Sequence, residues 1–380
     1  MSQNLKARLR QIHSTRTSRT TQQESPASEE NLTTLWPNWE EAGYMTLKRE
    51  TVHVLPSSCP DVFTDALAIV IPDFANIVTH STGRLPLPEE LLFFDLETTG
   101  LSGGAGTIAF LAAFGRLSPS GNNNTLLSIT QYLLLDYPGE YNFVEKLKEE
   151  FSDNNTPVLI TYNGKSFDSQ IFHNRCLMNR VKIPEYYHGD LLHPARRLWK
   201  NVLPNCSQAT IEVSILGLDR TGDVSGALAP DIWFSFLRNG NNSELLQICE
   251  HNEKDITGLA HLFLAMNEIA REPLKNSEKL LFDEEALAFT WEKAVKFNYF
   301  LSRPELRTLG EKILESAAKK GFRRASSYKY LAINAEWKEK NYSLALDYTR
   351  KALELPDLSD NCRYDLEKRL CRLEDKIARS

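Results

Sequence analysis

The sequence predicts a mixed α/β domain followed by an all-α region. Between about residues 86 and 272, short apolar runs alternate with polar turns and with helical patterns, whereas after Pro273 the apolar residues recur at helical spacing. At 380 residues the chain exceeds one ordinary domain, and its 42% hydrophobic and 25% charged residues are typical of a folded globular protein.

The totals exclude several classes of protein. No apolar run reaches transmembrane length, and the N-terminus is too polar for a secretory signal. The six cysteines form no Cys-x-x-Cys pair, which favours reduced thiols in a cytoplasmic protein over a disulfide framework or a zinc site. The net charge of −6 argues against a general polyanion binder, although a local basic groove is compatible with it.

Four segments are expected along the chain. Residues 1–35 are polar, with few large apolar groups, and are predicted to be a disordered basic tail that either touches nucleic acid or is only solvated. Residues 36–85 have a core-forming composition and are expected to be an N-terminal extension packing on the next domain. Residues 86–272 carry the α/β pattern, and residues 273–380 are predicted to be α-helical.

The order of elements in the α/β segment defines its fold class. Tight turns separate three expected strands, at residues 91–96, 107–114 and 126–135, which pair as an antiparallel meander. Helices near 143–151 and 166–179 then alternate with strands at 157–162 and 185–192, before helical sequence to about residue 270. This is the order of a ribonuclease-H-like mixed five-stranded sheet flanked by helices. Right-handed crossovers place the fourth strand beside the first.

Two acids lie at the end of the first strand. Four apolar residues run directly into Asp95, and Glu97 follows two positions later, so both carboxylates point to one side of a buried strand. Unpaired charges are costly in such a place, and oxygen ligands suit Mg²⁺ or Mn²⁺. The alternative is an acid pair that is merely solvated or salt-bridged.

Later segments supply more acids. Asp168 follows an Asn-Gly turn with Ser166 as the expected helix N-cap, and the strand order would bring it beside Asp95 and Glu97, unless it only interacts with the helix dipole. His251 and Asp255 stand four apart on an amphipathic helix, where they form either part of a metal site or a surface ion pair.

Together these residues resemble the three motifs of the DEDD-superfamily 3′-5′ exonucleases, namely Asp95-x-Glu97-Thr-Thr-Gly, Asn163-Gly-x-x-Phe167-Asp168 and His251-x-x-x-Asp255. Other segments resemble the YprB-like bacterial branch of that superfamily, related to the proofreading domain of family-B polymerases: Gly104-Ala-Gly-Thr107, Asp190-Leu-Leu-His193 and Gly217-Leu-x-Arg220-x-x-Asp223-x-x-Gly226. The resemblance covers residues 85 to 270. It implies that Asp95, Glu97, Asp168 and Asp255 bind two divalent cations, Mg²⁺ or Mn²⁺.

One departure from the family pattern concerns proton transfer. Histidine-type members carry His five positions before the last Asp, where this chain has Glu250; tyrosine-type members carry Tyr four positions before it, where this chain has His251. Because a neutral imidazole can accept a proton near pH 7, His251 is expected to be the base or to orient the attacking water. Asn252 is an alternative that shares this role.

Several side chains are candidates for gripping the substrate. Phosphate contacts of this type carry no sequence information, and aromatic rings could stack on a terminal base. The predicted nucleic-acid-binding residues are Thr98, Asn163, Lys165, Phe167, Arg196, Arg197 and Arg220, with Arg175, Lys200, Tyr162 and Trp233 as further candidates. The alternative for each is a solvated charge or a core aromatic.

The last hundred residues contain a pattern that resembles one tetratricopeptide (TPR) unit. It runs from Leu331 to Pro356, with small residues at Ala345 and Ala352 that let paired helices approach closely. A TPR-like domain is expected either to bind a protein partner or only to stabilise its neighbours.

The leading hypothesis is a metal-dependent 3′-5′ exonuclease that acts on single-stranded DNA or RNA ends by a two-metal-ion mechanism. The alternatives are a non-catalytic nucleic-acid- or protein-binding scaffold and a structure-selective endonuclease on the same fold. The sequence leaves open the choice between DNA and RNA.

Overall fold

The computed structural model describes residues 36–100, 106–120, 124–151, 156–356 and 358–379. The described chain divides into two compact units, the first ending at residue 272 but also including 278–281, and the second formed by 273–277 and the residues from 282 onward. The expected basic tail and the Gly-rich turn at 103–105 lie outside the described residues. Within the described ranges no helix is both long and apolar enough to span a lipid bilayer.

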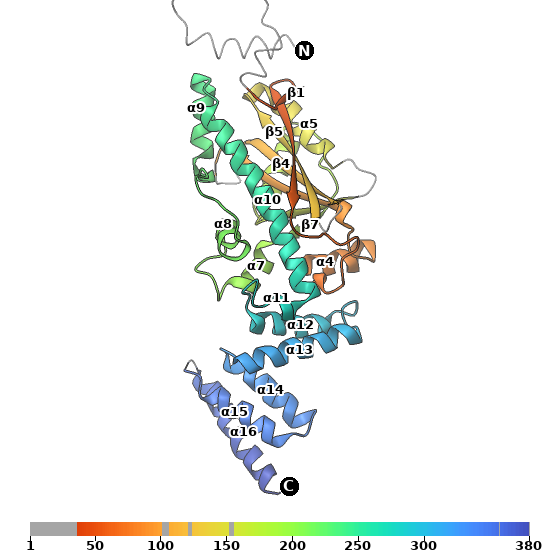
Figure 1. Cartoon of the computed structure of the whole chain (residues 1–380), viewed down its shortest axis with the longest axis vertical. Helices are drawn as coiled ribbons and strands as arrows, with labels where there is room; N and C mark the ends of the chain where they lie inside the picture. The colour runs from red at the N-terminus through yellow and green to blue at the C-terminus, as the bar shows by residue number, and fades with distance from the viewer. Residues whose placement is uncertain (1–35, 101–105, 121–123, 152–155, 357, 380) are drawn as a thin grey trace, which may run out of the picture. The chain divides into compact units, whose positions relative to one another are not determined.

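The first unit is built on one mixed sheet of seven strands in the order β1-β2-β5-β4-β3-β6-β7 (Figure 1). The predicted meander is present, because β3 pairs with β4 and β4 with β5 in antiparallel fashion. β6 lies parallel to β3, so the predicted adjacency of the fourth and first core strands is confirmed. The strands are β1 (Glu40–Gly43), β2 (Thr46–Leu55), β3 (Leu91–Thr98), β4 (Ala109–Ser120), β5 (Asn124–Leu134), β6 (Val158–Thr161) and β7 (Tyr187–Asp190).

The prediction of five strands is wrong, because the N-terminal segment contributes β1 and β2 to the same sheet. β2 pairs with β5 along its whole length, from Thr46 opposite Leu134 to Leu55 opposite Thr125. The β2 sequence mixes charged and apolar side chains, which alternate between more exposed and more covered positions. Its hydrophobic run is therefore short, and the pairing that stabilises it is distant in sequence.

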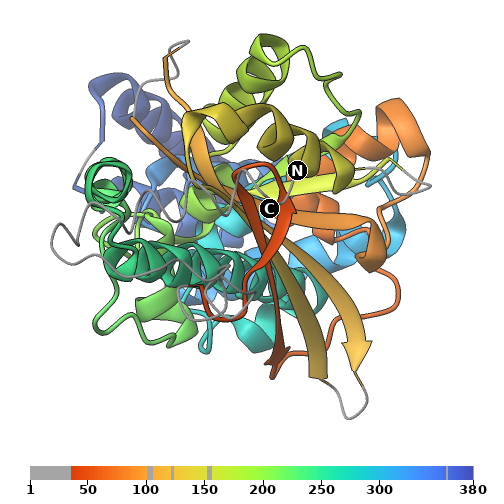
Figure 2. The same cartoon turned by 90° about the horizontal axis from the view of Figure 1, so that it is seen from above.

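The two faces of the sheet are covered by different helices. Phe93 on β3 contacts Phe263 of α10 (Ser243–Arg271), whereas the next residue, Phe94, contacts Phe172 of α6 (Asp168–Met178). Because side chains alternate along a strand, Asp95 shares the face of Phe93, which is the α10 face. Figures 1 and 2 show α10 running along this face of the sheet.

α10 approaches the sheet closely over β4. A Cβ atom on Gly115 of β4 would lie only 2.7 Å from Cγ2 of Ile256, so no other residue would fit there without moving the helix. A Cβ on Gly258 would overlap the Glu212 carboxylate, at 1.6 Å from its Oε1. These two glycines therefore allow α10 to bring its polar side chains against the sheet on one side and against Glu212 on the other.

The remaining helices of the first unit surround this core. The start of one of them, α6, differs from the prediction. The N-cap of α6 is Phe167 and makes no side-chain cap hydrogen bond, so the expectation of Ser166 as N-cap is corrected. The other α-helices are α3 (Leu67–Val70), α4 (Pro72–Ile77), α5 (Glu140–Glu149), α7 (Leu192–Trp199), α8 (Gln208–Ile211) and α9 (Ala229–Asn239). Short 3-10 or π segments are η1 (Val78–Thr82), η2 (Pro88–Glu90), η3 (Tyr137–Gly139), η4 (Glu212–Leu216) and η5 (Gly226–Leu228).

The described residues of the second unit form only helices and the loops between them. α12 packs on α13, α14 on α15, and α15 on α16. The small side chains of Ala345 and Ala352 are fully buried at these contacts, as close helix packing requires. The TPR-like assignment stays a prediction. The helices are α11 (Pro273–Asn276), α12 (Glu284–Phe297), α13 (Pro304–Lys320), α14 (Ala325–Trp337), α15 (Tyr342–Leu353) and α16 (Asp360–Ala378).

Candidate active site

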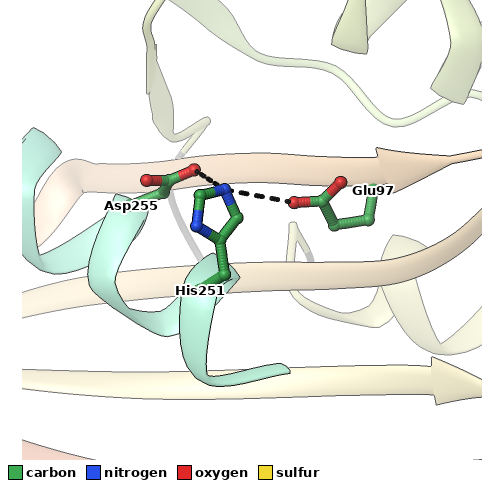
Figure 3. Close-up of side chains that lie close together, drawn as sticks. All are labelled: Glu97, His251 and Asp255. Atoms are coloured by element: carbon green, nitrogen blue, oxygen red, sulfur yellow. Dashed lines mark ion pairs between the residues drawn. The ribbon is translucent and has the colours of Figure 1, made fainter. Parts of the chain in front are cut away.

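The predicted acids gather where β3 meets α10 and the start of α6. Figure 3 shows His251 of α10 between Asp255, on the same helix, and Glu97 of β3. His251 Nε2 lies 3.3 Å from Asp255 Oδ2 and 3.9 Å from Glu97 Oε1. One ligand atom from each of these three residues lies within 4.8 Å of the others, which is a spacing that a metal ion could occupy.

The carboxylates of this site oppose one another's ionisation. Burial raises the pKa of Asp95 well above its ordinary value, and the charges of Asp255, Asp168 and Glu97 raise it further. Burial and the charges of Asp255 and Asp168 raise the pKa of Glu97 in the same way. Burial also raises the pKa of Asp168 to about 7. A cluster of buried oxygen donors with this mutual repulsion fits a hard divalent cation, which would stabilise their charged forms.

His251 is oriented by a carboxylate that lies behind it. Its Nδ1 lies 3.0 Å from Oδ2 of Asp223. Burial tends to raise the pKa of Asp223, but hydrogen bonds from Arg220 and His251 outweigh it and hold that pKa below its ordinary value. Asp223 is therefore an acceptor, so His251 donates from Nδ1 and turns Nε2 toward Glu97 and Asp255.

Arg220 joins three carboxylates around the site. Its Nε lies 2.6 Å from Oε2 of Glu212, Nη1 lies 2.7 Å from Oδ2 of Asp223, and Nη2 lies 2.5 Å from Oδ1 of Asp255. Each guanidinium nitrogen thus faces a carboxylate within the protein, and the side chain is only 11% exposed. This placement differs from the predicted phosphate contact, because Arg220 instead fixes Asp255 and Asp223 relative to each other.

Gly226 lies directly over the site, at the start of η5. A Cβ atom on it would lie 3.0 Å from His251 Nε2 and 3.7 Å from Glu97 Oε1. Because glycine has no side chain, it leaves the space above His251 Nε2 and Glu97 Oε1 open. The roles of Gly226, Asp223 and Glu212 were not predicted from the sequence, although the first two belong to the quoted segment from Gly217 to Gly226.

The loop that precedes Asp168 is held by Asp190 at the end of β7. The buried Asp190 carboxylate accepts hydrogen bonds from the backbone N–H groups of Asn163, Lys165 and Leu192, at 2.9, 3.0 and 3.0 Å. Asn163 has a φ of 68°, a left-handed conformation that asparagine tolerates better than most residues. Asp190 therefore fixes the turn that aims α6, and its first residue Asp168, at β3.

The predicted nucleic-acid-binding residues other than Arg220 differ in their exposure to solvent. Arg196 and Arg197 are exposed on α7, and Lys165 is exposed with its Nζ 2.6 Å from Oδ1 of Asp73. Thr98 is buried and donates from Oγ1 to the Gly100 carbonyl oxygen at 2.9 Å. The remaining two lie beside Asp168: Asn163 is exposed, and Phe167 is half-buried against the core.

Two of the further candidates prove to be core residues. Trp233 is fully buried, stacks on Phe110 and donates from Nε1 to the Leu134 carbonyl oxygen at 3.0 Å. Arg175 is buried and its Nε lies 2.5 Å from Oε1 of Glu140. Both expectations of substrate contact are therefore corrected, because these groups already have partners inside the protein.

Comparison with known proteins agrees with this architecture. Residues 92–267 match the family described as the RNase_H superfamily, so this region is a ribonuclease-H-like domain. Domains of this superfamily are usually those of hydrolytic nucleases and commonly bind divalent metal ions. Within that class the chain is similar to the "Uncharacterized protein YprB" of Bacillus subtilis (strain 168), with 38% identity over 181 residues. The aligned segment covers 47% of this chain and 42% of that relative.

Proposed function

We propose that this protein is a metal-dependent 3′-5′ exonuclease that hydrolyses phosphodiester bonds at single-stranded DNA or RNA ends. The observation that carries the proposal is the convergence of Asp95, Glu97, Asp168 and Asp255, where burial and mutual charge repulsion raise the pKa values of Asp95 and Glu97. Strongly perturbed carboxylates from separate elements mark a site whose chemistry uses their charge. The ribonuclease-H-like domain supports a hydrolytic nuclease.

In this proposal the four carboxylates hold two divalent cations, Mg²⁺ or Mn²⁺. When bound, such ions supply an activated water and charge stabilisation for the leaving oxygen. The chain's own contribution is to hold the carboxylates in place: Arg220 fixes Asp255, and the Asp190-bound turn fixes Asp168.

His251 is the proposed proton acceptor. His251 Nδ1 donates a hydrogen bond to Asp223, so the lone pair of the imidazole is on Nε2 and is directed toward the carboxylates. Nε2 can therefore take a proton from an attacking water, and Asp223 stabilises the imidazolium that forms. Asn252 does not share this role in the proposal, because its amide donates a hydrogen bond to Asp95.

Three exposed cations are the proposed contacts to the nucleic-acid backbone. Lys165, Arg196 and Arg197 would pair with phosphates, and Phe167 would stack on a base near the cleaved end. Thr98, the last residue of β3, and Asn163, two residues after the end of β6, would contact the terminal nucleotide. The TPR-like helices are a separate proposal for a protein-binding surface.

Digestion of single-stranded oligonucleotides labelled at the 5′ end tests the proposed polarity. With Mn²⁺ or Mg²⁺, we expect a ladder of 5′-labelled products that shortens with time, and we expect EDTA to stop it. Parallel DNA and RNA substrates would identify the sugar, because a site that contacts the 2′-hydroxyl discriminates between them.

A circular single strand separates the proposal from its alternatives. An exonuclease leaves the circle intact, whereas an endonuclease linearises it. Cleavage of the circle would overturn the exonuclease proposal, and binding without cleavage under both metals would favour a non-catalytic scaffold.

A further inference from the structure

A row of side chains crosses four strands beneath α10. Arg49 of β2 lies opposite Gln131 of β5, Gln131 lies opposite Ala113 of β4, and Ala113 lies opposite Asp95 of β3. Residues paired in this way project from the same face of the sheet. Ala113 contributes only a methyl group to the row, and Asn252 of α10 makes the connection above it: the amide bonds both Gln131 and Asp95, at 2.9 and 2.7 Å.

Along this row, each polar side chain donates a hydrogen bond to the next in the same order, from Arg49 to Asp95. A guanidinium can only donate, and Arg49 donates from Nε to Oε1 of Gln131 at 3.0 Å. The Gln131 amide must therefore turn its NH₂ toward α10, where it donates to Asn252 Oδ1 and to the Cys249 carbonyl oxygen, each at 2.9 Å. Since Asn252 uses its oxygen for Gln131, only its NH₂ remains for Asp95.

Besides Gln131, two groups hold Arg49 in place. It forms an ion pair with Glu253 of α10, and its guanidinium lies 5.2 Å from the ring centroid of Trp39. The other oxygen of Glu253 lies 2.7 Å from Nε2 of His53, farther along β2. Arg49, Trp39 and His53 all precede residue 92, where the match to the RNase_H superfamily begins.

We propose that Arg49 is a positioning residue for the acidic site: together with the Cys249 carbonyl oxygen, it fixes the direction of the Gln131–Asn252 hydrogen-bond relay, so that Asp95 Oδ2 receives an N–H donor. This inference rests on the proposed function in one respect, namely that Asp95 is a cation ligand. Hydrogen bonds to one oxygen of a ligating carboxylate set the orientation of the whole group, and loss of such partners typically lowers metal affinity about 10–100-fold.

Binding of Mn²⁺ alone to the full chain, measured by isothermal titration calorimetry, tests the inference. Arg49→Met removes the donor and is expected to weaken Mn²⁺ binding about 10-fold or more. Arg49→Lys keeps a group that can only donate and is expected to restore most of the affinity. Lys48→Met, on the same strand, removes a cation whose ion pair is with Glu50, and should change affinity by less than about twofold.

Two substitutions of Gln131 distinguish positioning from simple packing. Gln131→Glu still accepts from Arg49 but cannot donate to Asn252, so the Asn252 amide would reverse and present its oxygen to Asp95. Gln131→Met removes every hydrogen bond of this side chain but leaves Asn252 able to donate to Asp95. We therefore expect the Gln131→Glu protein to bind Mn²⁺ more weakly than the Gln131→Met protein. The opposite order in Mn²⁺ affinity would overturn the inference.

The proposed function and the relay can fail separately. If the unaltered chain binds Mn²⁺ but cuts no nucleic acid, the nuclease proposal falls and the relay remains. If Arg49→Met matches the unaltered protein in Mn²⁺ affinity, the relay falls whatever the nuclease activity. Circular dichroism and the thermal midpoint of each variant show whether a loss of affinity comes only from unfolding, which would also count against the relay.

Discussion

A buried acid of the second unit and the buried acids of the candidate active site differ in how their charge is compensated. In the helical second unit, Glu336 of α14 is fully buried and forms ion pairs with Arg369, Arg372 and Lys376 of α16. Burial tends to raise the pKa of Glu336, but hydrogen bonds from Arg372 and Lys376 outweigh that effect and lower it. The acid is ionised and compensated within the protein.

In the sheet domain, burial and charge repulsion outweigh the hydrogen bonds, so the pKa values of the buried acids of the site are raised. Asp95 accepts its hydrogen bond from a neutral amide, and other acids face it, so burial and repulsion raise its pKa. Burial alone therefore does not distinguish a functional acid from a structural one. The difference lies in whether the protein supplies the compensating charge itself or leaves that to a bound cation.

The largest effect is expected from removing one acid of the repelling group. Asp95→Asn should lower nuclease activity by more than about 100-fold, because it removes a proposed cation ligand. It should not lower the thermal midpoint in EDTA, because it also relieves repulsion. Glu250→Gln, an exposed acid on α10 next to His251, is the matched control and should retain activity. Full activity in Asp95→Asn would contradict the proposed site.

The compensated acid should respond in the opposite sense. Glu336→Gln is expected to lower the free energy of unfolding of the second unit by about 3 kcal/mol, because three cations lose the charge that pairs with them. Urea denaturation followed by circular dichroism measures this change. Glu374→Gln, which affects an exposed pair with Arg350, should cost less than about 1 kcal/mol. Equal costs for the two variants would remove the basis of the comparison.

A smaller change is expected at the orienting carboxylate. Asp223→Asn lets the side chain donate to His251 Nδ1, which favours the tautomer with the proton on Nε2. We expect kcat to fall about 10-fold or more while Mn²⁺ affinity changes less, because Asp223 contacts the histidine and Arg220. The pH dependence of kcat should shift as well. A change confined to Mn²⁺ affinity, with kcat intact, would assign Asp223 to the metal and not to proton transfer.

The last prediction is a pH dependence of stability without metal. The pKa of Asp168 is raised to about 7, above its value of about 3.9 in an unfolded chain. The folded state therefore binds more protons between these values, and stability should fall as pH rises from about 4 to 7. In EDTA we expect the thermal midpoint to drop by a few degrees across this range. Asp168→Asn should weaken the dependence without abolishing it, because the raised pKa values of Asp95 and Glu97 act in the same direction. Mg²⁺ should raise the midpoint more at pH 8 than at pH 5.

The sequence indicated much of the α/β arrangement because its signals are local. The apolar run before Asp95, the turns around the meander and the helical spacing of α5 and α6 each lie within a few residues of one another. The order of those elements was then enough to place β6 beside β3. The spacing of His251 and Asp255 likewise predicted that they share a helical face, and the structure places their side chains 3.3 Å apart.

The parts that the sequence did not predict depend on contacts between distant segments. β2 reads as a weak strand and is fixed by a partner about eighty residues away, as the pairing of Arg49 with Gln131 illustrates. Arg220 resembled a phosphate-binding residue because charge alone does not reveal which carboxylates surround it. Trp233 and Arg175 were misassigned for a similar reason, since their buried partners lie 99 and 35 residues away.

The pairing of β2 with β5 also determines how the protein can be dissected. A fragment that began at Leu91 would contain the whole region that matches the RNase_H superfamily, residues 92–267, but it would lack the ten residues of β2. The N–H and C=O groups of β5 that now pair with β2 would form an open edge, lined by apolar residues such as Leu127 and Ile129. Such an edge recruits strands from other molecules, so this fragment is expected to aggregate, whereas one beginning before Trp36 should stay monodisperse.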